Sequence, residues 1–146
     1  MTNLKGRIFV RAYLTAHGVY YSNNFIRAIG YPIVFLYKLF FNYFLTFEIP
    51  PEARIGKGLQ CYHCFGIVIH KEVLIGKNCT LRHNVTIGNN ISGGGVPTIG
   101  NNVNIGSGAV IIGDIYIADN VKIGANAMVT KDVPENTTVV GINEFK

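Results

Sequence analysis

Residues 99–133 read IGNNVNIGSGAVIIGDIYIADNVKIGANAMVTKDV, and an aliphatic residue returns in this stretch at every sixth position. The first residues of these hexapeptides are Ile99, Ile105, Ile111, Ile117, Ile123 and Val129, and a second apolar series follows four positions after each. An α-helix is excluded, because residues six apart are rotated by about 240° around a helix axis. Short extended segments joined by tight turns fit the period, with the first and fifth positions facing inward.

The same phase continues upstream through Ile69, Ile75, Leu81 and Ile87, with Val73, Cys79, Val85 and Ile91 at the fifth positions. An earlier frame, made of Ile49, Ile55, Cys61 and Ile67, is offset from the later one by two residues. The chain is therefore predicted to have three parts: an N-terminal helical arm over 1–48, a repeat domain over 49–140 and a short tail over 141–146.

Composition limits the function classes. Hydrophobic residues make up 49% and charged residues 14%, which excludes disorder. The net charge of +5 is concentrated in residues 1–54, which hold six Lys or Arg against two Asp or Glu. A nucleic-acid footprint would continue through the folded body, so no nucleic-acid partner is expected. Three cysteines are an odd count, which favours a reducing, cytoplasmic compartment.

The arm contains an apolar run over 28–47, AIGYPIVFLYKLFFNYFLTF. A charge at bilayer depth costs at least ~2.5 kcal/mol, so Lys38 disfavours a membrane span. Packing against protein is the prediction, and lying on a membrane surface is the alternative. In that alternative, Lys5, Arg7, Arg11 and Arg27 would give reversible adhesion to an anionic surface at the inner face of the cell membrane.

The repeats resemble those of the hexapeptide-repeat acyltransferases. The resemblance implies a mainly β fold: a left-handed parallel β-helix of triangular section, in which three hexapeptides form one coil. The repeat domain would supply about five coils, each rising ~4.8 Å. The resemblance also implies a homotrimer with active sites between subunits, and the arm would cover the N-terminal end of the β-helix.

Two histidines carry the candidate chemistry. His63 and His83 each lie two positions after an inward-facing residue, and their separation of 20 residues equals one coil plus the two-residue offset. Both imidazoles are therefore expected at one corner, on neighbouring coils. A neutral imidazole there would remove the proton of an acceptor hydroxyl during acyl transfer from a thioester. The alternative is that both are ordinary surface residues.

Segment 62–69, YHCFGIVI, resembles the serine acetyltransferase segment in which an Asp-His pair precedes a Gly-Ile-Val run. His63 matches the catalytic histidine, but Tyr62 replaces its acidic neighbour. In those enzymes a second catalytic histidine lies in the loop that here reads SGGGVPT (92–98), where Val96 stands in its place. These two departures disfavour serine as the acceptor.

A second resemblance, to exopolysaccharide acetyltransferases of the colanic-acid type, covers nearly the whole chain. That family shares the imidazole at His63 and an Arg-His-x-Val-Thr-Ile-Gly segment, here 82–88. The resemblance implies that His63 is the general base and that His83 is its partner or an oxyanion donor. If His63 is only structural, His83 is the base.

The resemblance also implies the acetyl-CoA contacts, in a groove between two subunits. It assigns the pantetheine arm to corner positions one coil apart, Asn89, Ser107 and Ala125. In segment 129–134, VTKDVP, Thr130 and Lys131 match the pair that reaches the nucleotide, and Lys131 would pair with a phosphate. Without the family, Ser107 and Ala125 are ordinary turn residues.

No metal site is predicted. Cys61 faces the core, and Cys61, His63 and Cys64 fall short of four arranged ligands. His17 and His70 carry no supporting pattern and are expected in solvent.

The predicted function is acetyl-CoA-dependent O-acetylation of a sugar hydroxyl in a surface polysaccharide, its lipid-linked precursor or a nucleotide sugar. The alternatives are a serine O-acetyltransferase and a non-catalytic β-helix scaffold.

Overall fold

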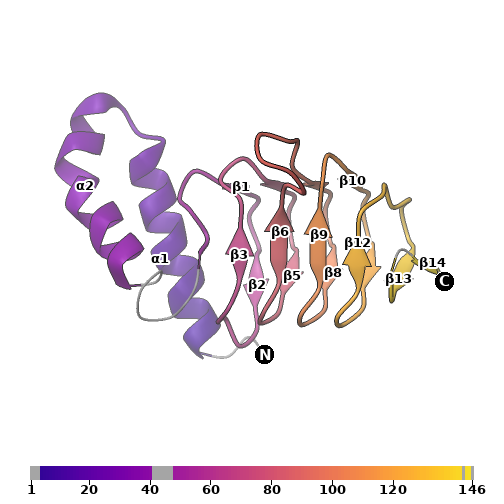
Figure 1. Cartoon of the computed structure of the whole chain (residues 1–146). Coiled ribbons are helices and arrows are strands. Elements are labelled where there is room, and N and C mark those ends of the chain that lie inside the picture. The colour runs from indigo at the N-terminus through magenta and orange to yellow at the C-terminus, as the bar shows by residue number, and fades with distance from the viewer. Residues whose placement is uncertain (1–3, 41–47, 143, 146) are drawn as a thin grey trace.

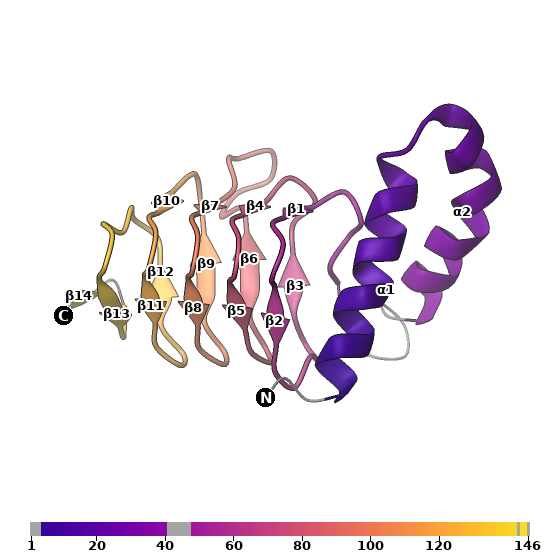
Figure 2. The same cartoon turned by 180° about the vertical axis from the view of Figure 1, so that it is seen from behind.

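The computed structural model describes residues 4–40, 48–142 and 144–145. A slender solenoid of short parallel strands forms the body, and two helices lie against its N-terminal end (Figure 1). Helix α1 spans Leu4–Tyr20 and helix α2 spans Asn24–Lys38. Helix α1 packs on the first coil, whereas α2 lies on the outer side of α1 (Figures 1 and 2).

The strands form three sheets, which are the three walls of the solenoid. In the order in which the chain visits them, sheet I contains β1 (Arg54–Ile55), β4 (Leu74–Ile75), β7 (Thr98–Ile99) and β10 (Tyr116–Ile117). Sheet II contains β2 (Gln60–Cys61), β5 (Thr80–Leu81), β8 (Asn104–Ile105), β11 (Lys122–Ile123), β13 (Thr138–Val140) and β14 (Glu144–Phe145). Sheet III contains β3 (Val68–Ile69), β6 (Thr86–Gly88), β9 (Val110–Ile112) and β12 (Met128–Val129). Strand β14 pairs antiparallel with β13 at the C-terminal end, and all other pairs between strands are parallel. One strand of each sheet makes a coil, so β1–β3 form coil 1, β4–β6 coil 2, β7–β9 coil 3 and β10–β12 coil 4.

The core follows the predicted hexapeptide phase. Every first and fifth position from Ile99 to Val133 is buried, as are the earlier positions of the series from Ile49 to Ile87. Ile91 is the exception: the prediction that it faces inward is wrong, because its side chain is 67% exposed. Strands of two or three residues thus alternate one buried residue with outward ones, and the turns between them complete each wall.

Two insertions interrupt the regular coils. The first is in coil 1, where Cys61 and Ile69 are eight positions apart while their partners Leu81 and Ile87 are six apart. Two extra residues therefore bulge from the corner between sheets II and III. This bulge is the two-residue offset in the sequence.

The second insertion is in coil 2. Ile87 and Ile99 are twelve positions apart, while their partners Ile111 and Ile117 are six apart. Six extra residues lengthen the loop 89–97, which projects from the corner between sheets III and I (Figure 1). Ile91 lies in this loop, which explains its exposure.

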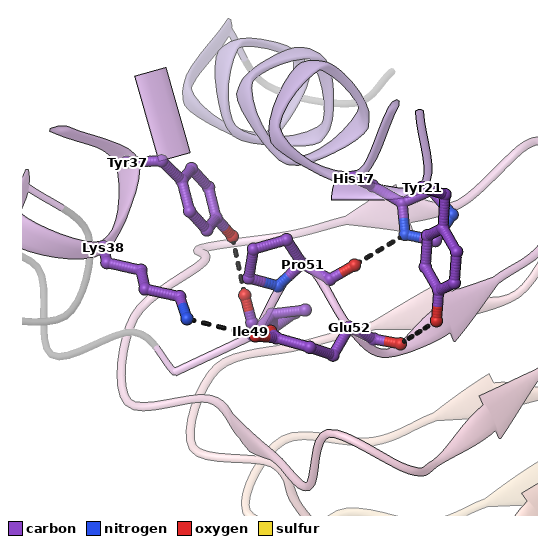
Figure 3. Close-up of polar contacts among 7 residues, drawn as sticks. All are labelled: His17, Tyr21, Tyr37, Lys38, Ile49, Pro51 and Glu52. Atoms are coloured by element: carbon purple, nitrogen blue, oxygen red, sulfur yellow. Dashed lines mark hydrogen bonds and ion pairs between the residues drawn. The ribbon is translucent and has the colours of Figure 1, made fainter. Parts of the chain in front are cut away.

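The helices cap the open end of the solenoid through hydrogen bonds to the chain that enters coil 1 (Figure 3). The hydroxyl of Tyr37 donates to the carbonyl of Ile49, and the hydroxyl of Tyr21 to that of Glu52, both at 2.8 Å. The Nδ1 atom of His17 donates to the carbonyl of Pro51 at 2.8 Å. The expectation that His17 is solvated is therefore wrong: it is half-buried and helps to fix α1 on the solenoid.

Two tyrosine hydroxyls are buried at this junction. Tyr13 donates to the carbonyl of Ala53, and Tyr37 donates to that of Ile49. Burial raises the pKa of both hydroxyls far above the ordinary value of 10.0, because the anion would lose its hydration. Both side chains therefore stay protonated, as hydrogen-bond donors, wherever the fold is intact.

Helix α2 is only partly covered. It packs on α1, with Gly30 against Val19, and it buries Val34 and Tyr37. Lys38 forms a 3.1 Å ion pair with Glu52. Its other large apolar side chains are exposed: Phe25, Ile26, Ile29, Tyr31, Ile33, Phe35 and Leu36. The predicted packing of the apolar run on protein thus holds for one face within this chain, and residues 41–47 of the run lie outside the described residues. Neither α1 nor α2 is both long and apolar enough to cross a membrane.

The cysteines include one pair that the sequence analysis did not predict. Cys61 and Cys64 form a disulfide, and Cys79 is a buried free thiol. The pairing follows from local backbone shape: the bulge brings the two Cα atoms to 5.8 Å, within the range that a disulfide spans.

Candidate active site

One edge of the solenoid collects four of the predicted residues. The corner between sheets II and III carries His63 on coil 1, His83 on coil 2, Ser107 on coil 3 and Ala125 on coil 4, and we call it the histidine edge. Backbone bonds fix this stacking: Gly108 N donates to His83 O at 3.0 Å, and Asn126 N donates to Ser107 O at 2.8 Å.

His63 lies in the two-residue bulge. Its φ of 53° is in the left-handed region, where the regular corners of the solenoid place Asn or Gly. Its imidazole is exposed, and the ring centroid lies 6.0 Å from that of His83, with the two planes at 82°. The predicted meeting of both histidines at one corner of neighbouring coils is confirmed.

His83 is more enclosed than His63. Its ring stacks on Phe65, with centroids 5.2 Å apart and planes at 21°. Its Nδ1 atom is buried and has no hydrogen-bond partner among the residues that the structure describes. A buried ring nitrogen without a partner is costly, so this atom marks a place where a ligand or a second chain would complete the contacts.

Sequence reasoning missed two further side chains of this site. Phe65 lies in the same bulge as His63 and stacks on His83. Arg82 donates to Asn104 Oδ1 at 2.6 Å and lies over the Tyr62 ring, 5.9 Å from its centroid. The bulge was visible as the phase offset, but nothing in the sequence said which of its side chains would turn toward His83.

Asn89, Thr130 and Lys131 lie on a different edge. Asn89 follows β6 and the other two follow β12, so all three lie at the corner between sheets III and I, across sheet III from the histidines. The expected alignment of Asn89 with Ser107 and Ala125 is wrong, because six extra residues, the length of one hexapeptide, lie between Ile87 and Ile99. Asn89 therefore lies at the corner after sheet III, whereas Ser107 and Ala125 lie at the corner after sheet II. The coil-2 residue aligned with Ser107 is His83.

The histidine edge carries groups that are suited to acyl transfer. The exposed His63 imidazole is accessible to an acceptor, and an imidazole is the usual general base for a hydroxyl near neutral pH. Along the same edge toward the C-terminus, Ser107 and Ala125 are small, so a ligand can approach the backbone beside them. In the described ranges, no group of three or more His, Cys, Asp or Glu side chains could hold a metal ion.

Comparison with known proteins identifies the family. The family model for bacterial transferase hexapeptide (six repeats) matches residues 97–131. A protein of Escherichia coli strain K12 assigned to colanic acid biosynthesis, the acetyltransferase WcaB, is 36% identical over 143 residues, covering 95% of this chain and 88% of WcaB. This chain belongs to the hexapeptide-repeat acyltransferase family. It is an acyltransferase enzyme, and the alternative of a non-catalytic scaffold is not supported.

Serine acetyltransferases of this family match this chain at about the same sequence identity as WcaB does. Serine acetyltransferase 1, chloroplastic, of Arabidopsis thaliana is 37% identical over 139 residues, which cover 94% of this chain and 42% of that protein. Among solved structures, serine acetyltransferase of Neisseria gonorrhoeae superposes with a TM-score of 0.81 at 35% identity, over 97% of this chain and 54% of that one. A serine acetyltransferase complex with CoA has a TM-score of 0.77 at 28% identity, over 99% and 57%.

This chain thus spans about half the length of the solved serine acetyltransferases that it matches. The predicted fold, a left-handed parallel β-helix of about five coils behind a helical arm, is confirmed.

Proposed function

We propose that this acyltransferase transfers acetyl from acetyl-CoA to a sugar hydroxyl in the biosynthesis of a surface polysaccharide. The acceptor is the polymer, a lipid-linked precursor or a nucleotide sugar. The observation that carries the proposal is the histidine edge, where His63 and His83 meet beside Tyr62 and above the small residues Ser107 and Ala125. The match to WcaB, which covers most of both chains, supports a saccharide acceptor.

In the proposed mechanism His63 is the general base. Its ring removes the proton of the acceptor hydroxyl as the oxygen attacks the thioester carbonyl, and the C–S bond breaks when the tetrahedral intermediate collapses. The proton held by His63 then passes to the departing thiolate. His83 donates a hydrogen bond to the oxyanion or orients His63.

We propose that the working unit is a homotrimer. In it, the histidine edge of one subunit faces the corner between sheets III and I of its neighbour. Asn89, Thr130 and Lys131 lie across sheet III from the histidines, so a second copy is the simplest way to bring both sets to one ligand. Ser107 and Ala125 then contact the pantetheine arm together with Asn89, while Thr130 and Lys131 reach the nucleotide. Light scattering tests this: an active monomer would overturn the shared site.

The second candidate is serine O-acetylation, favoured by the serine acetyltransferases of equal identity. Against it stands Tyr62, which lies beside His63 where the serine enzymes carry an acid. Release of CoA thiol from acetyl-CoA, measured with serine and with a panel of oligosaccharide fragments, separates the two. The proposal expects turnover with a saccharide and none with serine, and the reverse result would replace it.

The enzyme is further proposed to work in the cytoplasm, with α2 in peripheral contact with the inner membrane face. Helix α2 exposes Phe25, Ile29 and Phe35, and Lys5 and Arg27 add positive charge on the same helical arm. Each such cation near an anionic surface contributes about 1 kcal/mol, so sedimentation with anionic vesicles should be sensitive to salt. Equal sedimentation with neutral vesicles, or none with either, would overturn the contact.

A further inference from the structure

A groove of ≈ 500 Å³ lies between α1 and coil 1, on the sheet II side of the solenoid. Helix α1 contributes Arg7, Val10 and Arg11, and coil 1 contributes Leu59, Gln60 and Tyr62. The groove therefore combines the apolar side chains of Val10 and Leu59 with two arginines of α1. Tyr62, which also lines the groove, directly precedes His63 in the chain.

The side chains of the two arginines of this groove are exposed. Arg7 and Arg11 are one turn apart, so they share one face of α1. Within the described part of the chain, neither side chain forms an ion pair or a hydrogen bond. No Asp or Glu is among the described residues that line the groove, and the undescribed stretches 1–3 and 41–47 contain none in their sequence.

A third arginine continues the positive charge toward the histidines. Arg82 lies over the Tyr62 ring and directly precedes His83 in the chain. The hydroxyl of Tyr62 lies 3.3 Å from Gln60 Oε1, so both side chains present polar groups along the same path. Positive charge and hydrogen-bonding groups thus run from α1 to the histidine edge without a compensating carboxylate.

We propose that this groove is an acceptor subsite for an oxyanion, in which Arg7 and Arg11 bind a carboxylate or phosphate carried by the saccharide. The inference rests on the proposed function and deepens it, because it names the charge class of the acceptor. Two guanidinium groups one turn apart suit an oxyanion, since each presents a planar fork of donors to two oxygens.

The geometry also explains why the subsite lies beside the reacting hydroxyl. An acceptor held by its oxyanion at Arg7 and Arg11 extends past Tyr62 to His63, the next residue. Aromatic rings commonly contact the apolar faces of sugars, and Tyr62 presents a half-buried ring at this point. The subsite therefore fixes the sugar so that one hydroxyl reaches the general base.

The test compares acceptors that carry an oxyanion with partners that lack it. One pair is a uronic-acid disaccharide and the methyl ester of its carboxylate, and the other is glucose 1-phosphate and glucose. Acetyl transfer is followed for each with wild-type protein, and acceptor binding is titrated without acetyl-CoA. We expect kcat/KM for at least one charged acceptor to exceed that of its neutral partner by about tenfold or more. Which pair shows the preference identifies the carboxylate or the phosphate as the source of the oxyanion.

Variants connect the preference to the groove. Arg7→Gln and Arg11→Gln should each raise KM for the charged acceptor about tenfold, with kcat within about twofold and the neutral acceptor unaffected. Arg11→Lys should retain part of the affinity, because charge remains while the fork is lost. Lys77→Gln is the matched control: it removes one exposed positive charge at the corner between sheets I and II, outside the groove and away from the edges proposed to bind acetyl-CoA, and should change neither constant.

Each failure has a distinct meaning. Equal transfer to charged and neutral saccharides would overturn the oxyanion subsite and leave sugar acetylation standing. A charge preference that survives in Arg7→Gln and Arg11→Gln would also overturn it. Transfer to serine alone would overturn the proposed function itself, whatever the titrations give.

Discussion

The regular coils and the interrupted coils of this β-helix contribute differently to its structure and to its candidate active site. Coils 3 and 4 repeat every six residues from Ile99 to Val129, and their buried positions stack in register without a break. Coils 1 and 2 carry both insertions, and the insertions bring His63 and Phe65 to the histidine edge and the loop 89–97 to the next edge. The regular coils build the scaffold, and the candidate chemistry lies where the repeat fails.

The largest expected effect on stability comes from a substitution in the regular coils. Ile111→Ala removes a fully buried side chain of coil 3 and should lower the free energy of unfolding by about 2–5 kcal/mol. Ile91→Ala makes the same chemical change at an exposed position of the loop and should change the free energy of unfolding by no more than about 0.5 kcal/mol. Urea unfolding at one protein concentration measures both. Equal losses would mean that the loop, too, is part of the packed core.

A smaller effect, on turnover, tests the role of the interrupted coils. His83→Ala should lower turnover about tenfold if His83 donates to the oxyanion or orients His63. Steady-state kinetics with the best acceptor would measure it, together with the double variant His63→Ala/His83→Ala. A double variant no worse than either single variant would show that the two rings act as one unit. Unchanged turnover in His83→Ala would exclude it from the site.

The smallest effect concerns the capped end. Tyr13 and Tyr37 have raised pKa values in the folded protein, so above pH about 10 the unfolded chain loses protons that the folded chain keeps. Stability from these hydroxyls is therefore complete below pH 10 and falls as the pH rises further. Tyr13→Phe/Tyr37→Phe should lose about 2 kcal/mol at pH 7 and show a weaker alkaline fall in the free energy of unfolding.

The exposed Tyr31 is the control for the capped end, and Tyr31→Phe should leave both the stability and its pH profile unchanged. An alkaline fall of wild-type steepness in the double variant would show that other groups cause it.

The hexapeptide phase was sufficient to predict the core and the fold, but its two interruptions behave differently in a sequence. The two-residue bulge breaks the phase, so it is visible, and it led to the pairing of His63 with His83. The six-residue insertion keeps the phase, because its length equals the repeat. It was therefore invisible, and Asn89 and Ile91 were assigned to a wall and an inward position that they do not occupy.

Other parts of the site depend on contacts that no period encodes. The hydrogen bond from His17 to Pro51 and the groove beside Arg7 and Arg11 exist because α1 docks on coil 1. That docking is set by buried side chains such as Phe9, Tyr13 and Ala16, whose spacing predicts a helix face but not its partner.

The central claim is that His63, raised out of the repeat by the bulge, performs the acid–base chemistry. The most direct test is turnover of His63→Ala against His70→Ala, a half-buried histidine at another corner of the same coil. We expect His63→Ala to lower kcat at least ~100-fold with the same thermal stability and oligomeric state, while His70→Ala keeps wild-type turnover. Retained activity in His63→Ala, or equal losses in both variants, would contradict it.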